Sequence, residues 1–271
     1  MKKTRGMKKA RVKMLSMKQK CKLALVIFAL CAWVVVVTVA VQFVLSLIMY
    51  VFLGEKLDEP VWTAVYSALV YSGVLAIILL VTPRLVANFS AKVGEEKKPE
   101  MATKADLGIR GEVEWTDILL SPIAYVVGTL LAAGLMSLFS GFTWFDAGQA
   151  QSTGFEPYMN APERIIAFIT LAVIAPIAEE VIFRGWLYGR IRERLHGKVA
   201  EWAGIVISTL VVSVTFGLVH MQWNVGVNVF ALSLVLCALR EITGKIYAGI
   251  FTHMIKNAVA FYLLYILGFG V

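Results

Sequence analysis

The chain has 271 residues, of which 59% are hydrophobic, and its mean hydropathy is +0.77. Several apolar runs reach 18 residues or more, so this composition excludes a soluble globular domain. The runs are continuously apolar and do not alternate, which favours helices over a β-barrel. We therefore predict an all-α, polytopic membrane helix bundle with about seven transmembrane or re-entrant helices.

The net charge of +8 is concentrated at one end of the chain. Residues 1–22 hold ten lysines and arginines and no acid, so the remaining residues together carry −2. A basic segment directly before an apolar span is typical of a cytoplasmic topology signal, and docking on anionic lipid or nucleic acid is the alternative. Cys21, Cys31 and Cys237 are widely spaced and indicate neither a disulfide framework nor a metal site.

Seven apolar stretches follow the basic segment. We predict spans over 23–53, 61–82, 117–141, 164–189, 202–221, 225–239 and 246–268. With seven spans, the loops rich in lysine and arginine fall on the same side as the tail, which predicts a cell-membrane protein with a cytoplasmic N-terminus. The sixth span is only about 22 Å long at the helical rise. We therefore expect the fifth and sixth spans to turn within the bilayer around 221–226.

The fourth span carries two adjacent acids, Glu179 and Glu180, followed by Arg184. Ionisable groups at the bilayer centre cost about 2.5–3.5 kcal/mol each on insertion scales, so their presence indicates chemistry or transport. Glu180 and Arg184 are i, i+4 neighbours and are predicted to form a structural ion pair. Glu179 points about 100° away and is a candidate general base. The alternative is that both acids only join packed helices.

Two later spans add imidazoles at helical spacing. Phe216 and His220 share a face at the end of the fifth span, and His253 and Asn257 share a face in the seventh. An imidazole and an amide one turn apart can donate two hydrogen bonds to one oxyanion. Polar interhelical contacts are the alternative for each pair. Lys256 is expected to point to a different face, toward the lipid edge or into a structural role.

Three motifs stand in order, each within a predicted span. They are EExxxR at Glu179–Arg184, FxxxH at Phe216–His220 and HxxxN at His253–Asn257, and Arg240 to Gly244 is similar to a basic-Thr-Gly turn that accompanies them. Over about residues 106–268 the chain resembles the CAAX-protease and bacteriocin-processing (CPBP) family of intramembrane endopeptidases, the group of the type II CAAX prenyl endopeptidase.

The resemblance implies a role for each matched residue. Glu179 would activate a water for attack on the scissile carbonyl, and His220 would orient or deprotonate that water. His253 and Asn257 would stabilise the tetrahedral oxyanion. The supporting residues would be Glu180, Arg184, Phe216 and Arg240.

Zinc is a second possibility for the same residues. Glu179, His220 and His253 could supply a His₂Glu set. The HExxH spacing that places two histidines on one helical face is missing, however, and asparagine is a poor zinc ligand. We therefore expect that no cofactor is required.

The resemblance also divides the chain. We expect a basic cytoplasmic tail over 1–22, an accessory transmembrane hairpin with a cytoplasmic loop over 23–105, and a CPBP-like intramembrane protease domain over 106–271. The substrate would be a membrane peptide or a lipid-modified protein C-terminus, cut near the membrane surface; the lipid bilayer is the other partner, and no nucleic acid is expected. Two alternatives stay open: a non-catalytic bacteriocin-immunity or binding protein, and an ion-coupled transporter, which the lack of repeated halves disfavours.

Overall fold

The computed structural model describes residues 16–54, 56, 59–92, 100–149, 153–155 and 159–268. Within these ranges seven helical runs are long and apolar enough to cross a membrane. They cover Met17–Leu53, Pro60–Asn88, Trp115–Phe139, Ala161–Leu195, Glu201–Leu218, Trp223–Thr243 and Tyr247–Ile266. The predicted all-helical membrane bundle is thereby confirmed. Most of the predicted basic tail, residues 1–15, lies outside the described residues.

Several of these runs change helical register along their length. The first span is the single helix α1 (Met17–Leu53), and the second joins α2 (Pro60–Ala76), the π-helical segment η2 (Ile77–Val81) and α3 (Thr82–Lys92). The third span is α4 (Trp115–Phe139). The fourth runs through α5 (Ala161–Ile169), η3 (Thr170–Ile174), α6 (Ala175–Glu180), η4 (Val181–Leu187) and α7 (Tyr188–Leu195). The last three are α8 (Glu201–Leu218), α9 (Trp223–Thr243) and α10 (Tyr247–Phe261), the last extended by η5 (Tyr262–Ile266).

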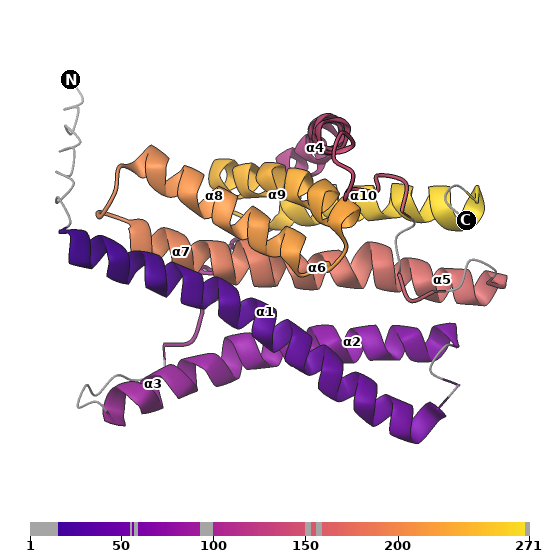
Figure 1. Ribbon diagram of the computed structural model, residues 1–271, viewed down its shortest axis with the longest axis horizontal. Helices are drawn as coiled ribbons and strands as arrows, with labels where there is room; N and C mark the ends of the chain where they lie inside the picture. The colour runs from indigo at the N-terminus through magenta and orange to yellow at the C-terminus, as the bar shows by residue number, and fades with distance from the viewer. Residues whose placement is uncertain are drawn as a thin grey trace.

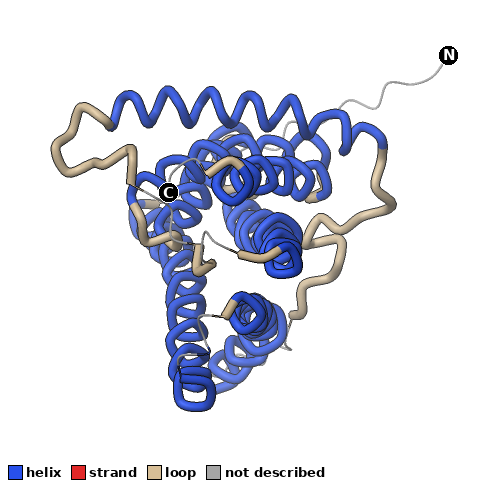
Figure 2. The backbone as a smooth tube through the Cα atoms, turned by 90° about the vertical axis from the view of Figure 1, so that its right-hand side faces the viewer, coloured by secondary structure: helices blue, strands red, loops and turns tan. Residues whose placement is uncertain are grey.

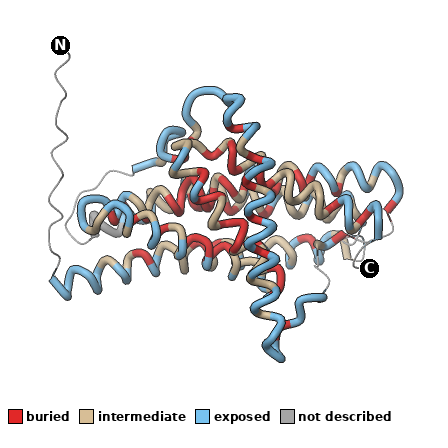
Figure 3. Tube along the Cα trace, turned by 90° about the horizontal axis from the view of Figure 1, so that it is seen from above, coloured by how far each residue is buried: buried red, intermediate tan, exposed pale blue. Residues whose placement is uncertain are grey.

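The fourth span forms the middle layer of the molecule. Figure 1 shows α5, α6 and α7 as one rod, with α8, α9 and α10 on one side and α1, α2 and α3 on the other. Helix α4 packs on α9 and α10 and lies across the top of Figure 2. Buried residues gather where these layers meet, whereas the helix ends and outer faces are exposed (Figure 3). Large apolar side chains such as Phe28, Phe43 and Leu119 are exposed on α1 and α4, as expected for faces that contact lipid.

Capping residues explain where two of the spans begin. Ser16 accepts a hydrogen bond from the Gln19 N–H, and the Gln19 side chain accepts one from the Ser16 N–H. Asn160 and Glu163 form the same reciprocal pair ahead of α5. Each capping box satisfies two backbone donors that the first helical turn leaves without partners.

The α8–α9 hairpin is built on two glycines. A Cβ added to Gly217 would lie 2.9 Å from the Gly226 carbonyl oxygen, and one added to Gly226 would lie 3.0 Å from that of Gly217. The two backbones therefore touch directly beside the turn at 219–222. At its apex Met221 has a φ of 54°, a left-handed value that side chains other than glycine rarely adopt.

The sixth span is longer than the sequence indicated. Helix α9 has 21 residues, about 32 Å at the helical rise, so the prediction of a short span over 225–239 is wrong. Asn224 and Arg240 lie inside the helix, although their polarity is typical of loop residues. Its length therefore gives no reason for the hairpin to turn within the bilayer.

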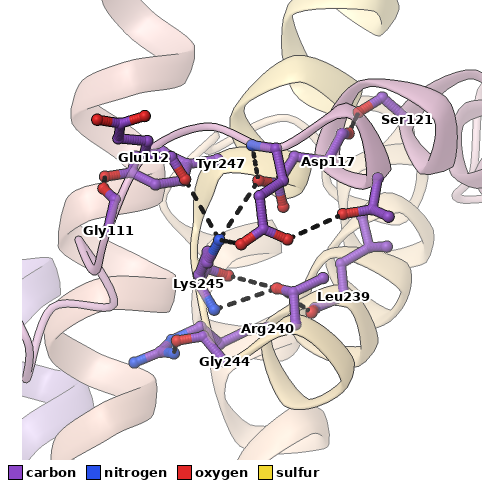
Figure 4. Close-up of polar contacts among 12 residues, drawn as sticks. Gly111, Glu112, Asp117, Ser121, Leu239, Arg240, Gly244, Lys245 and Tyr247 are labelled. Carbon is purple, nitrogen blue, oxygen red and sulfur yellow. Dashed lines mark hydrogen bonds and ion pairs between the residues drawn. The ribbon is translucent and has the colours of Figure 1, made fainter.

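The turn between α9 and α10 is fixed to the start of α4. Lys245 extends its ammonium to the Glu114 carboxylate and to the Glu112 carbonyl, and Asp117 lies 4.0 Å away (Figure 4). The hydrogen bond from Lys245 lowers the pKa of the Glu114 carboxyl from its ordinary value. Tyr247 adds a hydrogen bond from its hydroxyl to the Gly111 carbonyl at 3.2 Å. The ion pair and hydrogen bonds of Lys245 hold the beginning of α10 and thus set the position of its polar face.

Arg240 joins three segments at this end of the bundle. Its guanidinium donates to the carbonyls of Arg184, Asp106 and Gly244. Gly108 has a φ of 73°, and an added Cβ there would lie 2.6 Å from the Arg240 Cζ, so only glycine lets the loop before α4 pack on the guanidinium. Arg240 supports the fourth span from behind and does not reach the cavity described next.

Candidate active site

The polar side chains of the fourth span lie between two π-helical segments. Glu179 and Glu180 end α6, with η3 before that helix and η4 after it. Pro176 has no N–H, and the Ala175 N–H bonds five residues back to Thr170. In a π-helix each N–H donates to the carbonyl five residues back, so the Leu171 carbonyl would be bonded by the N–H of residue 176. Because this residue is proline, the Leu171 carbonyl has no backbone donor. Short π-helical stretches are frequent at functional sites for such reasons.

Asn257 supplies the missing donor. Its side-chain amide donates to the Leu171 carbonyl at 2.8 Å and so joins α10 to η3. An amide NH₂ group carries two hydrogens, and this bond uses one of them. Asn257 therefore stabilises the π-helical segment and still has one hydrogen to donate.

Glu180 and Arg184 form the ion pair that their spacing predicts. Arg184 Nη1 donates to Glu180 Oε1 at 2.8 Å, and both side chains are fully buried. The guanidinium carbon also lies 4.4 Å from the centroid of the Phe216 ring, a cation–π contact that compensates part of its desolvation. Gly249 of α10 makes room for the pair, since a Cβ there would lie 3.0 Å from Glu180 Oε2.

His253 lies between the two glutamates. Its Nδ1 is 3.2 Å from Glu180 Oε1, and because a carboxylate only accepts, Nδ1 is the donor. Its Nε2 lies 3.7 Å from Glu179 Oε2. One imidazole thus connects the structural ion pair with the second carboxylate, which the sequence left without a partner.

Glu179 has a partner that sequence reasoning missed. Tyr71, on α2, donates its hydroxyl hydrogen to Glu179 Oε1 at 2.7 Å. No motif spacing marks this tyrosine, which stands in an ordinary apolar run of the second span. The predicted accessory hairpin therefore contributes a side chain to the site itself.

His220 is oriented by the end of its own helix. Its backbone N–H bonds to the Gly217 carbonyl, which leaves the Phe216 carbonyl for the ring, and Nδ1 lies 2.8 Å from that oxygen. Since a carbonyl only accepts, Nδ1 carries the hydrogen, and in the neutral ring Nε2 holds the lone pair. The Phe216 ring stands at 82° to the His220 ring and at 89° to that of His253.

These groups surround one cavity of about 310 Å³. Glu179, His220, His253 and Asn257, the four predicted catalytic residues, all line it. Thr38 of α1 and Tyr71 of α2 are among the residues that complete the wall. The fully buried Glu180 and Arg184 stand behind the cavity. The structure therefore brings together side chains from three motifs that are spread over 79 residues of sequence.

Comparison with known protein families finds a match in this part of the chain. Residues 161–259 match the family model described as type II CAAX prenyl endopeptidase Rce1-like. The chain carries a domain of this family. The Rce1-like domain covers the fourth to the seventh spans, apart from their outermost residues, and includes all three motifs, whereas α1, α2 and α4 lie outside the match. No curated protein and no solved structure matches the chain. Membership in the family supports intramembrane endopeptidase activity.

Lys256 of the Rce1-like domain does not lie where its position in the sequence predicted. It lines the cavity together with Glu179 and therefore does not point toward the lipid edge. Residues 253 and 256 are i, i+3 neighbours, which share a helical face as i, i+4 neighbours do. The i, i+4 spacing of His253 and Asn257 marks the same face without including Lys256.

The donor set of the Rce1-like domain does not form a metal site. In the described part of the chain, no three His, Cys, Asp or Glu side chains lie where they could hold a metal ion together. The zinc set considered above, Glu179 with His220 and His253, is therefore not gathered in metal-binding geometry.

Proposed function

We propose that the protein is a glutamate-type intramembrane endopeptidase that hydrolyses peptide bonds near the membrane surface. The observation that carries this proposal is the convergence of Glu179, His220, His253 and Asn257 on one cavity within the bundle. A general base for the water and hydrogen-bond donors for the oxyanion are groups that promote water-mediated amide hydrolysis, and these four side chains can supply both.

Glu179 activates the water. Tyr71 occupies one oxygen of its carboxylate and fixes the rotation of the side chain, so that Oε2 faces His253 across 3.7 Å. A water held by Oε2 gives up a proton to the carboxylate as its oxygen attacks the scissile carbonyl carbon. Glu179 then passes this proton to the amide nitrogen as the oxyanion collapses and the C–N bond breaks. His220, with Nε2 as its free lone pair, orients this water or shares the proton.

His253 and Asn257 stabilise the oxyanion. In its protonated form His253 carries an N–H at Nε2 that can donate to the developing charge, while Nδ1–H stays on Glu180. The second amide hydrogen of Asn257 supplies the other donor. Removal of one preorganised oxyanion donor typically lowers kcat by about 10²–10³. Glu180 and Arg184 hold His253 in place and take no part in the proton transfer.

We further propose that no metal is required and that the substrate is a membrane peptide or a lipid-modified protein C-terminus. The family description supports a CAAX-type tail, a C-terminal segment that begins with a lipid-modified cysteine. The clustering of lysine and arginine on one set of loops supports a multi-pass protein of the cell membrane with its N-terminus in the cytoplasm.

The test is Glu179→Gln in the purified full chain, reconstituted in liposomes with a peptide of S-farnesylcysteine followed by three residues. Loss of the base should lower the cleavage rate by about 10²–10⁴ without loss of the folded state. Glu163→Gln is the matched control, because glutamine keeps the capping box at the start of α5. Full cleavage by Glu179→Gln would refute the assignment of Glu179 as the base, whereas no cleavage by the unaltered chain would favour the non-catalytic binding protein.

A further inference from the structure

Helix α10 directs three polar side chains at the cavity, and the proposed mechanism uses only two of them. His253, Lys256 and Asn257 stand at i, i+3 and i+4, the spacing of one helical face, and all three line the cavity. Lys256 is the single lysine or arginine among the cavity-lining residues that the structure describes. A positive charge at this depth of a membrane span is expensive and marks a functional site unless it is paired.

Lys256 has no such partner within the described residues. No carboxylate there lies within 4.0 Å of its ammonium and it makes no hydrogen bond, although Glu179 is near enough to interact with it electrostatically. The two nearby acids already have other partners at one oxygen each: Arg184 and His253 contact Glu180 Oε1, and Tyr71 contacts Glu179 Oε1. The half-buried ammonium of Lys256 is therefore available to an anionic group that enters the cavity.

We propose that Lys256 binds the free α-carboxylate at the C-terminus of the substrate. This inference rests on the proposed peptidase function and assigns to Lys256 the recognition of the chain end in substrates that are cut within a few residues of their C-terminus. Without Lys256, such a carboxylate would meet only the acid Glu179 and neutral or imidazole groups among the described lining residues, and like charges repel.

The dimensions fit this class of substrate. Lys256 lies three residues beyond His253, about 4.5 Å along the helix, and its flexible four-carbon stem extends the reach of the ammonium further. In an extended substrate each residue spans about 3.3 Å, so a carboxylate one to three residues past the scissile bond lies roughly 3–10 Å from it. A CAAX tail ends three residues after the modified cysteine. The cavity of about 310 Å³ lies at the lower end of the volumes typical of ligand pockets.

The experiment compares two peptides that differ only at the C-terminus. Both contain S-farnesylcysteine followed by the same three residues, and one ends in a free carboxylate while the other ends in a carboxamide. The reconstituted full chain should cleave the carboxylate peptide with a kcat/KM at least about tenfold higher. Lys256→Met should lose this preference by lowering kcat/KM for the carboxylate peptide alone, mainly through KM. Lys256→Arg should keep a large part of it.

Lys104→Met is the control, since it removes one exposed lysine from the loop before α4 and should preserve the preference. If Lys256→Met does not fold, Lys256→Gln provides the same comparison. Equal cleavage of both peptides by the unaltered chain would overturn the inference and leave the peptidase intact. An equal loss of kcat/KM on both peptides in Lys256→Met would also overturn it. That result would mean that Lys256 acts on Glu179 and not on the substrate carboxylate. Cleavage of neither peptide would refute the proposed function and the inference with it.

Discussion

The hydroxyl of Tyr71 donates to Oε1 of Glu179 across 2.7 Å, and it does so from a helix outside the Rce1-like domain. One oxygen of the proposed base is thus fixed by the second membrane span. We therefore expect the rate of hydrolysis to depend on a residue that the family motifs do not contain.

Tyr71→Phe removes that donor and retains the ring. We expect kcat to fall about tenfold, the effect of one hydrogen bond to a charged group, while KM changes little because the cavity keeps its shape. Steady-state kinetics on the farnesylated peptide provides the measurement. Tyr247→Phe, which removes a hydroxyl hydrogen bond far from the cavity, should leave kcat unchanged. A rise in KM at constant kcat would show that Tyr71 contacts the substrate and does not orient Glu179.

Glu180→Gln should act on stability. The substitution leaves the Arg184 guanidinium fully buried without its counter-charge, and breaking one partner of a buried pair typically costs about 3–5 kcal/mol. The free energy of unfolding in detergent should fall by this amount, whereas Glu179→Gln should change it by less than about 1 kcal/mol. A Glu180→Gln protein that is fully stable but inactive would show that Glu180 takes part in catalysis and is not only structural.

Asn257 and Pro176 are predicted to be coupled. Asn257→Ala leaves the Leu171 carbonyl without a partner, so we expect a loss of about 1–3 kcal/mol in the free energy of unfolding. Adding Pro176→Ala restores a backbone N–H at the position that faces this carbonyl, and the double variant should recover much of the loss. Cleavage should not recover, because the oxyanion donor is still absent. Recovery of both quantities would restrict Asn257 to a structural role.

Gly217→Ala tests the α8–α9 contact that positions His220. The new methyl group would lie 2.9 Å from the Gly226 carbonyl oxygen, so the helices must separate. Such overpacking typically costs about 1–3 kcal/mol, and the displaced turn should lower kcat as well. Gly134→Ala on α4 is the matched control, since a Cβ there meets nothing within 4 Å. The control should be neutral or slightly stabilising, which thermal unfolding of both variants can establish.

Metal removal should have no effect on cleavage. Because the described residues gather no three-ligand set, we expect dialysis against EDTA or 1,10-phenanthroline to leave kcat/KM within about twofold. The assay should include a known zinc peptidase as a positive control for chelation. Loss of activity that added Zn²⁺ restores would contradict the metal-free mechanism.

The sequence was sufficient to predict the class of fold and the clustering of the motif residues. Apolar runs of span length are the strongest signal that a single sequence carries, and all seven predicted spans correspond to helices. The spacing of Glu180 and Arg184 likewise specified their contact, because i, i+4 geometry is local. The error at the sixth span has the same origin, since polar residues such as Asn224 and Arg240 shortened the apolar run although they lie within α9.

Other features depend on contacts between distant segments. Tyr71 meets Glu179 across 108 residues of chain, and nothing local marks it among the other tyrosines. The bond from Asn257 to Leu171 exists because η3 adopts a π register ahead of Pro176, and apolar periodicity does not distinguish that register from an α-helix. The position of Lys256 could have been predicted from i, i+3 spacing alone.

Because α1 and α2 form part of the cavity wall, the residues of the three family motifs do not specify the whole site. A chimera that joins residues 161–259 to an unrelated transmembrane segment would contain Glu179, His220 and His253. It would lack the cavity wall that α1 and α2 form, and it would lack the Tyr71 hydroxyl that orients Glu179. Exchanging only α1 and α2 between related proteins would leave all three motifs unchanged and would still alter the shape and lining of the cavity.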